Sequence, residues 1–323
     1  MQISIIIPTY NRINDLAQCL VSLLYQTEKP DQILIIDDSE SCVVVDYIRK
    51  LKNDFRDADI QLNYQKNKRE KSLTIARNQG FIYAKGEILL FLDDDVILEK
   101  DYLANLTTAF RENPYIFGIQ GFVTNWPARS PAQKFFFTFT KKILHSRYDC
   151  FVTPSWLTVY DPKPDRELSS CEWFSGCNQA YRREVFDELR FDEQLKKYSS
   201  GEDIDFSYRV SRKYPDSLFL LSTARCVHNM SPAGRMPNEK KIVMQIVYAT
   251  YFYYKNIPQT TRNLLFLILG RIGFLAIEGC NILQNHKERR MAGFIAMIKG
   301  TILAFKYRAT LKKGDLSFMD QYI

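Results

Sequence analysis

Five apolar residues at 88–92 are followed directly by three consecutive aspartates, Asp93, Asp94 and Asp95. The apolar run has the length of one strand buried on both faces of a parallel sheet. Three adjacent carboxylates at its end repel one another, and burying them unpaired is costly. A divalent cation removes that cost, because Mg²⁺ takes oxygen ligands and shares them with phosphates. The pattern therefore favours a metal site at the end of a strand over a solvated acidic turn.

The first hundred residues alternate between strand and helix patterns. Strands are expected at 3–7, 33–36, 60–64 and 88–92, with helices near 14–24, 43–52 and 73–83 between them. This alternation predicts an α/β fold whose mostly parallel sheet carries helices on both faces. Asp37 and Asp38 then share one rim with the aspartate triplet, at the edge where open α/β sheets bind ligands.

Charge divides the 323 residues into two parts. Residues 240–323 hold 13 basic and 4 acidic residues, whereas the rest of the chain has a net charge of −2. The amino terminus shows no long apolar leader, and seven cysteines occur without CxxC spacing. We expect reduced thiols and a cytoplasmic protein, with a basic, aromatic tail that needs its own explanation.

Six short motifs follow one another along the chain. They are SIIIPTYNR at 4–12, DDS at 37–39, ARNQG at 76–80, DDD at 93–95, GCN at 176–178 and GEDID at 201–205. Together they resemble the family-two glycosyltransferases of GT-A fold, over roughly residues 3–230. The resemblance implies a mixed, mostly parallel sheet flanked by helices and an inverting enzyme that uses nucleotide-sugar donors. It also implies a catalytic domain at 1–239, with a nucleotide-binding half at 1–98, an acceptor half at 99–239 and a helical appendage at 240–323.

The resemblance implies a donor site and a metal site. Pro8, Thr9, Tyr10, Arg12, Asp38, Arg77, Asp93 and Asp94 are expected around the nucleotide sugar, and Asp93, Asp95 and His228 around Mn²⁺ or Mg²⁺. Other roles remain open: Tyr10 as an ordinary loop aromatic, Asp38 as a helix cap, Arg77 in a surface salt bridge, and His228 as a hydrogen-bonded structural residue. The sequence leaves the division of roles among the three aspartates undecided.

The resemblance also implies a base and an acceptor side. Asp203 matches the family's general base, which removes the acceptor hydroxyl proton. Trp173, Gly176, Cys177, Asn178 and Glu202 are expected on the acceptor side, because sugars stack on aromatic faces and glycine permits close approach. The alternative for the acidic cluster is the preference of helix N-termini for carboxylates, with Asp205 capping a helix or pairing with Arg209.

The tail contains apolar, aromatic helical stretches interrupted by charges, none long enough to cross a bilayer. This pattern favours helices lying on a membrane surface, on the cytoplasmic face, over a bundle packed on the catalytic domain or on a second subunit. We therefore expect a nucleotide-sugar donor, a glycan or lipid-linked acceptor, a membrane surface, a possible homo-oligomer and no nucleic acid. A catalytically silent nucleotide-sugar-binding scaffold and a sugar nucleotidyltransferase are the rival functions.

Overall fold

The computed structural model describes residues 1–126, 131–160, 166–233, 236–284 and 288–322. Its first part runs through β1 (Ile3–Thr9), α1 (Ile13–Leu24), β2 (Gln32–Asp37), α2 (Val43–Asp57), β3 (Gln61–Lys66), α3 (Leu73–Tyr83) and β4 (Ile88–Leu92). The α/β alternation expected from the apolar runs is confirmed. It arises because β1, β2 and β4 are buried along their whole length, so each strand appears in the sequence as a continuous apolar run.

The central sheet is mixed and mostly parallel in its first half. Its strand order is β3-β2-β1-β4-β10-β6-β11-β5, with β9 beside β11. The later strands are β5 (Val96–Leu98), β6 (Gly118–Val123), β9 (Leu168–Ser170), β10 (Asn178–Arg182) and β11 (Leu218–His228). β1 pairs in parallel with β2 and β4, whereas β10 runs antiparallel to β4. The carboxyl ends of β1, β2 and β4 therefore meet at one edge, which holds Thr9, Asp37 and Asp93.

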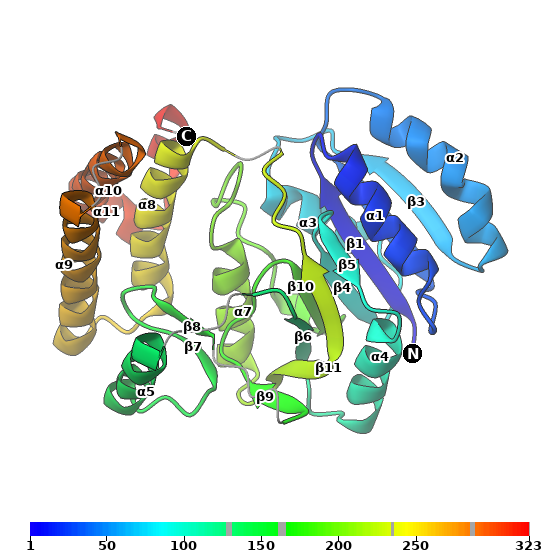
Figure 1. The fold of residues 1–323 in the computed structure, drawn as a ribbon, viewed down its shortest axis with the longest axis horizontal. Helices are drawn as coiled ribbons and strands as arrows, with labels where there is room; N and C mark the ends of the chain where they lie inside the picture. The colour runs from blue at the N-terminus through cyan, green and yellow to red at the C-terminus, as the bar shows by residue number, and fades with distance from the viewer. Residues whose placement is uncertain (127–130, 161–165, 234–235, 285–287, 323) are drawn as a thin grey trace.

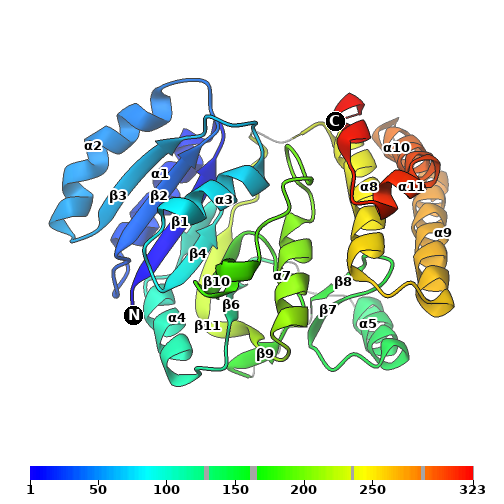
Figure 2. The same ribbon diagram turned by 180° about the vertical axis from the view of Figure 1, so that it is seen from behind.

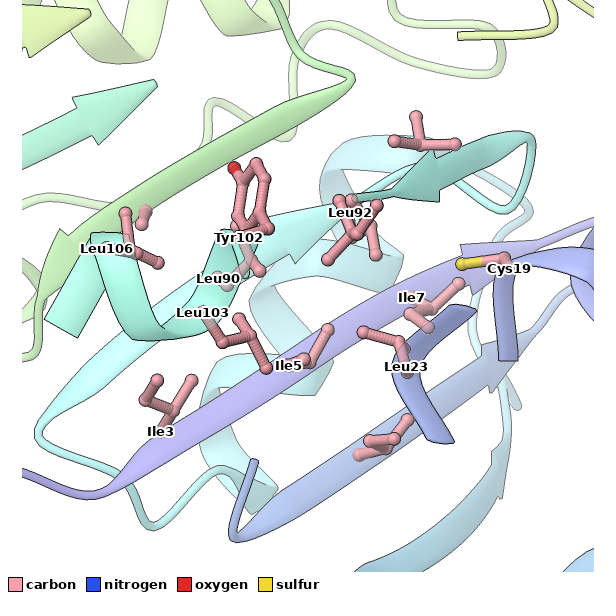
Figure 3. Packing of buried hydrophobic residues seen from close by; sticks show 14 of the residues in the cluster. Ile3, Ile5, Ile7, Cys19, Leu23, Leu90, Leu92, Tyr102, Leu103 and Leu106 are labelled. Carbon is pink, nitrogen blue, oxygen red and sulfur yellow. The ribbon is translucent and has the colours of Figure 1, made fainter. Parts of the chain in front are cut away.

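Helices cover both faces of this sheet (Figure 1). Apolar residues of α1, α2 and α4 (Tyr102–Glu112) pack on one face, where Ile3, Ile5 and Ile7 of β1 point. Figure 3 shows that packing, with Leu23 of α1 beside the strand. The other face, which receives Ile6, is covered by α3, α6 (Val185–Glu188) and α7 (Glu202–Lys213). The period-two alternation along β1 thus assigns its side chains to two separate cores.

The carboxyl-terminal helices stand beside α7 as a separate layer, which Figure 2 shows from behind. They are α8 (Asn238–Asn256), α9 (Thr261–Gln284), α10 (Glu288–Lys306), α11 (Arg308–Lys312) and the 3₁₀ helix η1 (Ser317–Gln321). Phe252 and Tyr253 of α8 belong to the core that contains α7, whereas Val243 and Val247 pack with α10 and α11. Among the described residues, no helix is long and apolar enough to span a membrane.

One further part of the chain lies beside α7 and α8. It comprises α5 (Pro131–Leu144) and the hairpin of β7 (Cys150–Val152) and β8 (Thr158–Tyr160). Phe151 and Val159 of the hairpin form a small apolar cluster.

Candidate functional site

A single cavity of about 830 Å³ lies at the carboxyl edge of the sheet and collects most of the predicted site residues. The predicted residues that line it are Pro8, Thr9, Tyr10, Arg12, Asp38, Arg77, Asp93, Asp94, Asp95, Gly176, Cys177, Glu202, Asp203 and His228. They come from segments up to 220 positions apart in the sequence. The parallel strands and the antiparallel return through β10 and β11 bring them to one edge.

Asp93, Asp95 and His228 form a cluster with the donor set of a divalent-cation site. One ligand atom from each residue lies within 4.8 Å of the others. Nε2 of His228, the last residue of β11, is 3.1 Å from Oδ1 of Asp95, and Asp95 is buried. Two carboxylates and an imidazole suit Mn²⁺ or Mg²⁺ better than soft metals. The residues therefore fit the expected ion.

The pKa values of His228 and Asp95 depend on the contact between these two side chains. Burial lowers the pKa of His228, but the neighbouring Asp95 and Cys177 outweigh burial and raise that pKa to about 10. Burial raises the pKa of Asp95, but His228 and the Ser231 N–H outweigh it and hold that pKa below its ordinary value. An imidazolium therefore neutralises the Asp95 carboxylate, and a metal ion held here would have to displace the imidazolium proton.

Asp94 is bonded to the end of β1 and the loop after it, through Thr9 and through Arg12, which it shares with Asp95. Its Oδ2 accepts a hydrogen bond from Thr9 Oγ1 at 2.7 Å, and its Oδ1 accepts one from Arg12 at 3.1 Å. Burial is the largest influence on the Asp94 carboxyl and raises its pKa to about 7, although Arg12 and Thr9 oppose it. Asp94 thus holds the loop after β1, whereas Asp93 and Asp95 form the candidate metal site with His228.

Asp38 and Tyr10, both expected beside the nucleotide, line the cavity. Asn67 donates a hydrogen bond to Asp38 Oδ1 at 2.5 Å, and burial raises the pKa of this carboxyl above its ordinary value. Asp38 does not cap a helix, because α2 begins only at Val43, after Cys42. Tyr10 is 40% exposed, and the ammonium of Lys71 lies 5.5 Å from its ring centre. The ring therefore has an accessible face.

Arg77 lies inside the site and not on the surface, because α3 packs closely against the sheet. Its side chain is 1% exposed and donates hydrogen bonds to Glu202 at 2.5 Å, to Asp93 at 3.1 Å and to the Gly176 carbonyl at 2.9 Å. Burial and the neighbouring Asp203 raise the pKa of Glu202 to about 8, although Arg77 opposes this. The guanidinium of Arg77 thus links Asp93 of the candidate metal site to Glu202 in the first turn of α7.

Asp203 lies in the first turn of α7 and is partly exposed to the cavity. Its Oδ2 accepts a hydrogen bond from the Gly176 N–H at 2.7 Å, and its Oδ1 accepts one from the Ile204 N–H at 2.9 Å. Burial raises the pKa of Asp203, opposed by Arg77 and these two N–H groups. A Cβ at residue 176 would lie 3.2 Å from the Asp203 Cβ, so glycine allows this approach.

The two other carboxylates at the start of α7, those of Glu202 and Asp205, form ion pairs with arginines. Glu202 is paired with Arg77, and Asp205 is paired with Arg209 at 2.9 Å, as one of the two expected alternatives stated. Asp205 also accepts hydrogen bonds from Lys255 and Asn256 of α8. Of these three acids at the start of α7, Asp203 alone forms no ion pair within the described part of the chain.

Two of the predicted acceptor residues, Trp173 and Asn178, lie away from this cavity. The indole of Trp173 is buried against the β7–β8 hairpin, where its Nε1 donates a hydrogen bond to the Val159 carbonyl at 3.1 Å. Asn178 is fully buried, accepts a hydrogen bond from the Gly121 N–H and donates one to Cys226 Sγ. Neither is among the described residues that line the cavity.

Part of the cavity wall was missed by the sequence reasoning. Lys197 and Tyr198 before α7, with Lys240, Lys241 and Gln245 of α8, also line it. The excess of basic residues after position 239 was the available signal. It pointed to a surface outside the catalytic domain, because the packing of α8 against that domain is a tertiary feature.

Comparisons with known proteins agree with this geometry. A family model described as glycosyl transferase family 2 matches residues 4–190, more than half of the chain. An uncharacterized glycosyltransferase of Rickettsia conorii is 37% identical over 116 residues, 36% of this chain and 18% of that protein. The uncharacterized glycosyltransferase YwdF of Bacillus subtilis is 27% identical over 218 residues, 66% of this chain and 69% of that protein. The chain thus spans less than a fifth of the Rickettsia relative.

Solved structures show the same fold at low sequence identity. S. aureus TarS 1-349 superposes with a TM-score of 0.56 at 17% identity, covering 97% of this chain and 83% of that chain. The mannosyltransferase PcManGT from Pyrobaculum calidifontis, in complex with GDP-Man and Mn²⁺, gives 0.59 at 14% identity, covering 94% and 87%. These likenesses establish a GT-A-like fold. With the family model and the shared motifs, they lead to one conclusion: the chain belongs to glycosyl transferase family 2.

Proposed function

We propose that this glycosyltransferase is metal-dependent and inverting, and that it moves a sugar from a nucleotide-sugar to a hydroxyl of a glycan or lipid-linked acceptor. The observation that supports this best is the shared cavity. Asp203 lines the same 830 Å³ space as the cluster of Asp93, Asp95 and His228, with Arg77 between them. A single displacement needs one base and a stabilised leaving group, and this cavity offers residues for both.

In the proposed reaction, Asp203 removes the proton from the acceptor hydroxyl. The hydroxyl oxygen bonds to the anomeric carbon as the bond to the diphosphate breaks, so the nucleoside diphosphate leaves with the electron pair and the configuration inverts. A divalent cation held by Asp93, Asp95 and His228 would supply Lewis-acid stabilisation of the diphosphate charge. The Gly176 N–H and the Ile204 N–H orient the Asp203 carboxylate for this task.

We propose a UDP-sugar as the donor. Asp38 and Tyr10 both line the cavity, where Asp38 would accept the N3–H of a uracil and the ring of Tyr10 would stack beside the base. Supporting this choice, TarS 1-349 has been solved in complex with UDP-GlcNAc, with a TM-score of 0.57 to this chain. The GDP-Man complex of PcManGT makes guanosine donors the comparison to include.

The test is a panel of nucleotide-sugars assayed for Mn²⁺-dependent release of nucleoside diphosphate. Asp203→Asn should keep donor binding but lower transfer by about 10²-fold or more, because the amide takes no proton. Asp57→Asn, an exposed change on α2, is the matched control. Near-normal turnover by Asp203→Asn would refute the base assignment.

The same assay separates the rival functions. A catalytically silent nucleotide-sugar-binding scaffold would bind donor without releasing nucleoside diphosphate under any metal condition. A sugar nucleotidyltransferase would release pyrophosphate instead, and Asp203 would then have no role in the reaction.

We also propose that α9 and α10 lie on an anionic lipid surface. Apolar side chains are exposed at helical spacing on α9, at Leu264, Leu265, Ile268, Leu269 and Ile272, and on α10, at Met291, Ile295, Ile298, Ile302 and Phe305. Exposed apolar stripes of this size mark an interaction surface. The excess of nine positive charges after position 239 favours anionic lipid over a second copy of a chain with the same charge. The cytoplasmic side of the membrane stays a prediction.

Vesicle flotation of the full chain tests this surface. Wild type should float with vesicles that contain phosphatidylglycerol, and Leu269→Asp/Ile302→Asp should remain in solution. Ile82→Asp is the control, because Ile82 is an exposed apolar residue (69%) on α3, away from this face. Equal flotation of all three proteins would contradict the lipid assignment. So would a wild-type protein that forms a dimer and does not float, while the double variant does float.

A further inference from the structure

Arg271 is a positively charged residue of α9 that the proposed reaction does not use. Its Nη2 donates hydrogen bonds to the Ile246 carbonyl oxygen at 3.3 Å and to Thr250 Oγ1 at 3.4 Å, both on α8. Burial lowers the pKa of Arg271 to about 10, and no carboxylate among the described residues opposes this lowering. A charge removed from water is costly unless it is paired. Arg271 is therefore a largely buried cation without an acidic partner in the described part of the chain.

The hydrogen bonds of Arg271 to α8 are weak and leave other donors unused. Both are long compared with the usual N–H···O length of about 2.9 Å. The Ile246 carbonyl also accepts the Thr250 hydroxyl at 3.0 Å, so Arg271 shares this acceptor. Its Nε and Nη1 form no hydrogen bond with a described residue, and neither is among the fully buried polar atoms without a partner. The side chain is partly exposed, so these two nitrogens can be reached by an external anion.

Arg271 lies beside the exposed apolar face of α9, the helix at the outer edge of the carboxyl-terminal layer (Figure 1). Ile268, one turn earlier, and Ile272, the next residue, are both exposed, as is Leu269 between them. These three residues are called here the apolar stripe. The guanidinium thus lies between the apolar stripe and α8, with which it forms its hydrogen bonds. An amphiphile that covered the apolar stripe with its chain would bring its polar group to Arg271.

We propose that Arg271 binds the phosphate group of an anionic phospholipid whose acyl chain lies along the apolar stripe. This inference rests on the proposed lipid surface of α9 and α10, and it adds one defined headgroup site to that surface. A guanidinium suits phosphate because its planar fork donates parallel, charge-assisted hydrogen bonds to the phosphate oxygens. The phosphate supplies the negative charge that Arg271 lacks among the described residues.

A phospholipid fits this place better than a second copy of the chain. Glu278 is the single carboxylate that another α9 would bring, and the excess of nine positive charges after position 239 would be doubled in such a pair. An anionic phospholipid offers a negative group and an apolar chain together, which matches a cation at the edge of an apolar stripe.

The test uses the full chain and a short-chain phosphatidylglycerol below its critical micelle concentration, titrated by isothermal calorimetry. Wild type should bind this probe at a saturable site, and Arg271→Met should bind it about tenfold or more weakly, because a charged hydrogen-bond donor is lost. Arg271→Lys should bind with intermediate affinity, since lysine keeps the charge but loses the fork. Arg262→Met removes an equal charge from an exposed position near the start of α9 and should bind like wild type.

Thermal unfolding separates a lipid site from a structural role. Without lipid, Arg271→Met should melt at the same temperature as wild type or higher, because an apolar side chain avoids the cost of a buried, unpaired charge. Vesicles that contain phosphatidylglycerol should raise the melting temperature of wild type more than that of Arg271→Met. A lower melting temperature of Arg271→Met without lipid would assign Arg271 to the packing of α9 on α8 and would overturn the proposal.

The remaining outcomes are distinguishable. Equal affinity of wild type and Arg271→Met for the short-chain lipid would overturn the headgroup site while leaving the lipid surface in place. A wild-type dimer that Arg271→Met dissociates would assign this face to a second copy and would also overturn the site. Failure of wild type to float with phosphatidylglycerol vesicles would instead refute the lipid surface on which the site rests.

Discussion

Lys255 of α8 places its ammonium nitrogen 2.9 Å from Oδ2 of Asp205, two residues after Asp203 on α7. The neighbouring Asn256 donates a hydrogen bond to the other oxygen of Asp205 at 2.8 Å, and Asp205 is 2% exposed. Lys255 also contacts Asp192, whose carboxylate accepts a hydrogen bond from Tyr251. The carboxyl-terminal helices thus hold in place the helix that presents the proposed base.

Replacing Lys255 by Met should destabilise the protein by about 1–3 kcal/mol, because Asp205 and Asp192 lose a charged hydrogen-bond donor while staying largely buried. Urea unfolding followed by circular dichroism gives this value. Lys313→Met, an exposed residue beyond α11, is the control. An unchanged unfolding midpoint for Lys255→Met would show that Arg209 and Asn256 suffice to hold Asp205.

Replacing His228 by Ala should weaken Mn²⁺ binding by about 10–100-fold, the effect typical of losing a residue that supports a metal site. Mn²⁺ should also raise the melting temperature of the wild type more than that of the variant, because ligands stabilise the state that binds them. Isothermal titration and thermal unfolding measure the two effects. An unchanged Mn²⁺ affinity would assign His228 the structural role of a hydrogen-bond partner for Asp95.

The buried Glu202 makes stability depend on pH. Burial and Asp203 raise its pKa from 4.5 to about 8. The folded state therefore binds a proton more tightly than the unfolded state, and this stabilisation is fully present below pH 4.5 and lost as pH rises through about 8.

Glu202→Gln should remove this loss, so its stability relative to wild type should increase between pH 4.5 and about 8. Thermal unfolding of both proteins with EDTA present, across that window, measures the difference. A constant difference between the two proteins would mean that Arg77 keeps Glu202 ionised throughout.

Gly201 precedes α7 with a φ of +89°, and a Cβ there would lie 2.0 Å from the ring of Trp156. Gly201→Ala should therefore destabilise the protein by more than about 1 kcal/mol, since both backbone strain and a clash oppose the methyl group. It should also lower transfer, because the first turn of α7 carries Asp203. Chemical unfolding and the transfer assay test both effects, with Gly273→Ala, whose added Cβ meets no atom within 4 Å, as the control.

The edge of the sheet that holds Asp37 and Asp93 was predictable, because the strand patterns that place these residues are local in the sequence. β4 is buried on both faces, so it appears as an uninterrupted apolar run, and Asp93 follows it without a gap. Parallel pairing then places Asp37 and Asp93 at one edge without further information. The candidate metal site of Asp93, Asp95 and His228 could not be predicted from one segment of the chain. The pairing of β11 with β5 is what brings His228 next to Asp95.

Other features depended on packing that no local pattern shows. Arg77 has the residue type of a surface position, yet α3 buries it because Glu202, Asp93 and the Gly176 carbonyl satisfy its charge. Trp173 has an aromatic side chain of the kind on which sugar rings stack, but the β7–β8 hairpin covers it. Lys240 and Lys241 reach the cavity because Phe252 and Tyr253 anchor α8 to the core containing α7.

The two ends of α8 have different neighbours, and these contacts limit where the chain can be truncated. Its first turns form a wall of the cavity, and its last residues hold Asp205. A chain cut at residue 239 would have an open-sided pocket and an unsupported α7. A cut after Asn256 would keep α8 but remove the residues of α10 and α11 that pack against its Val243 and Val247. A graft onto another carrier should therefore be placed beyond α11.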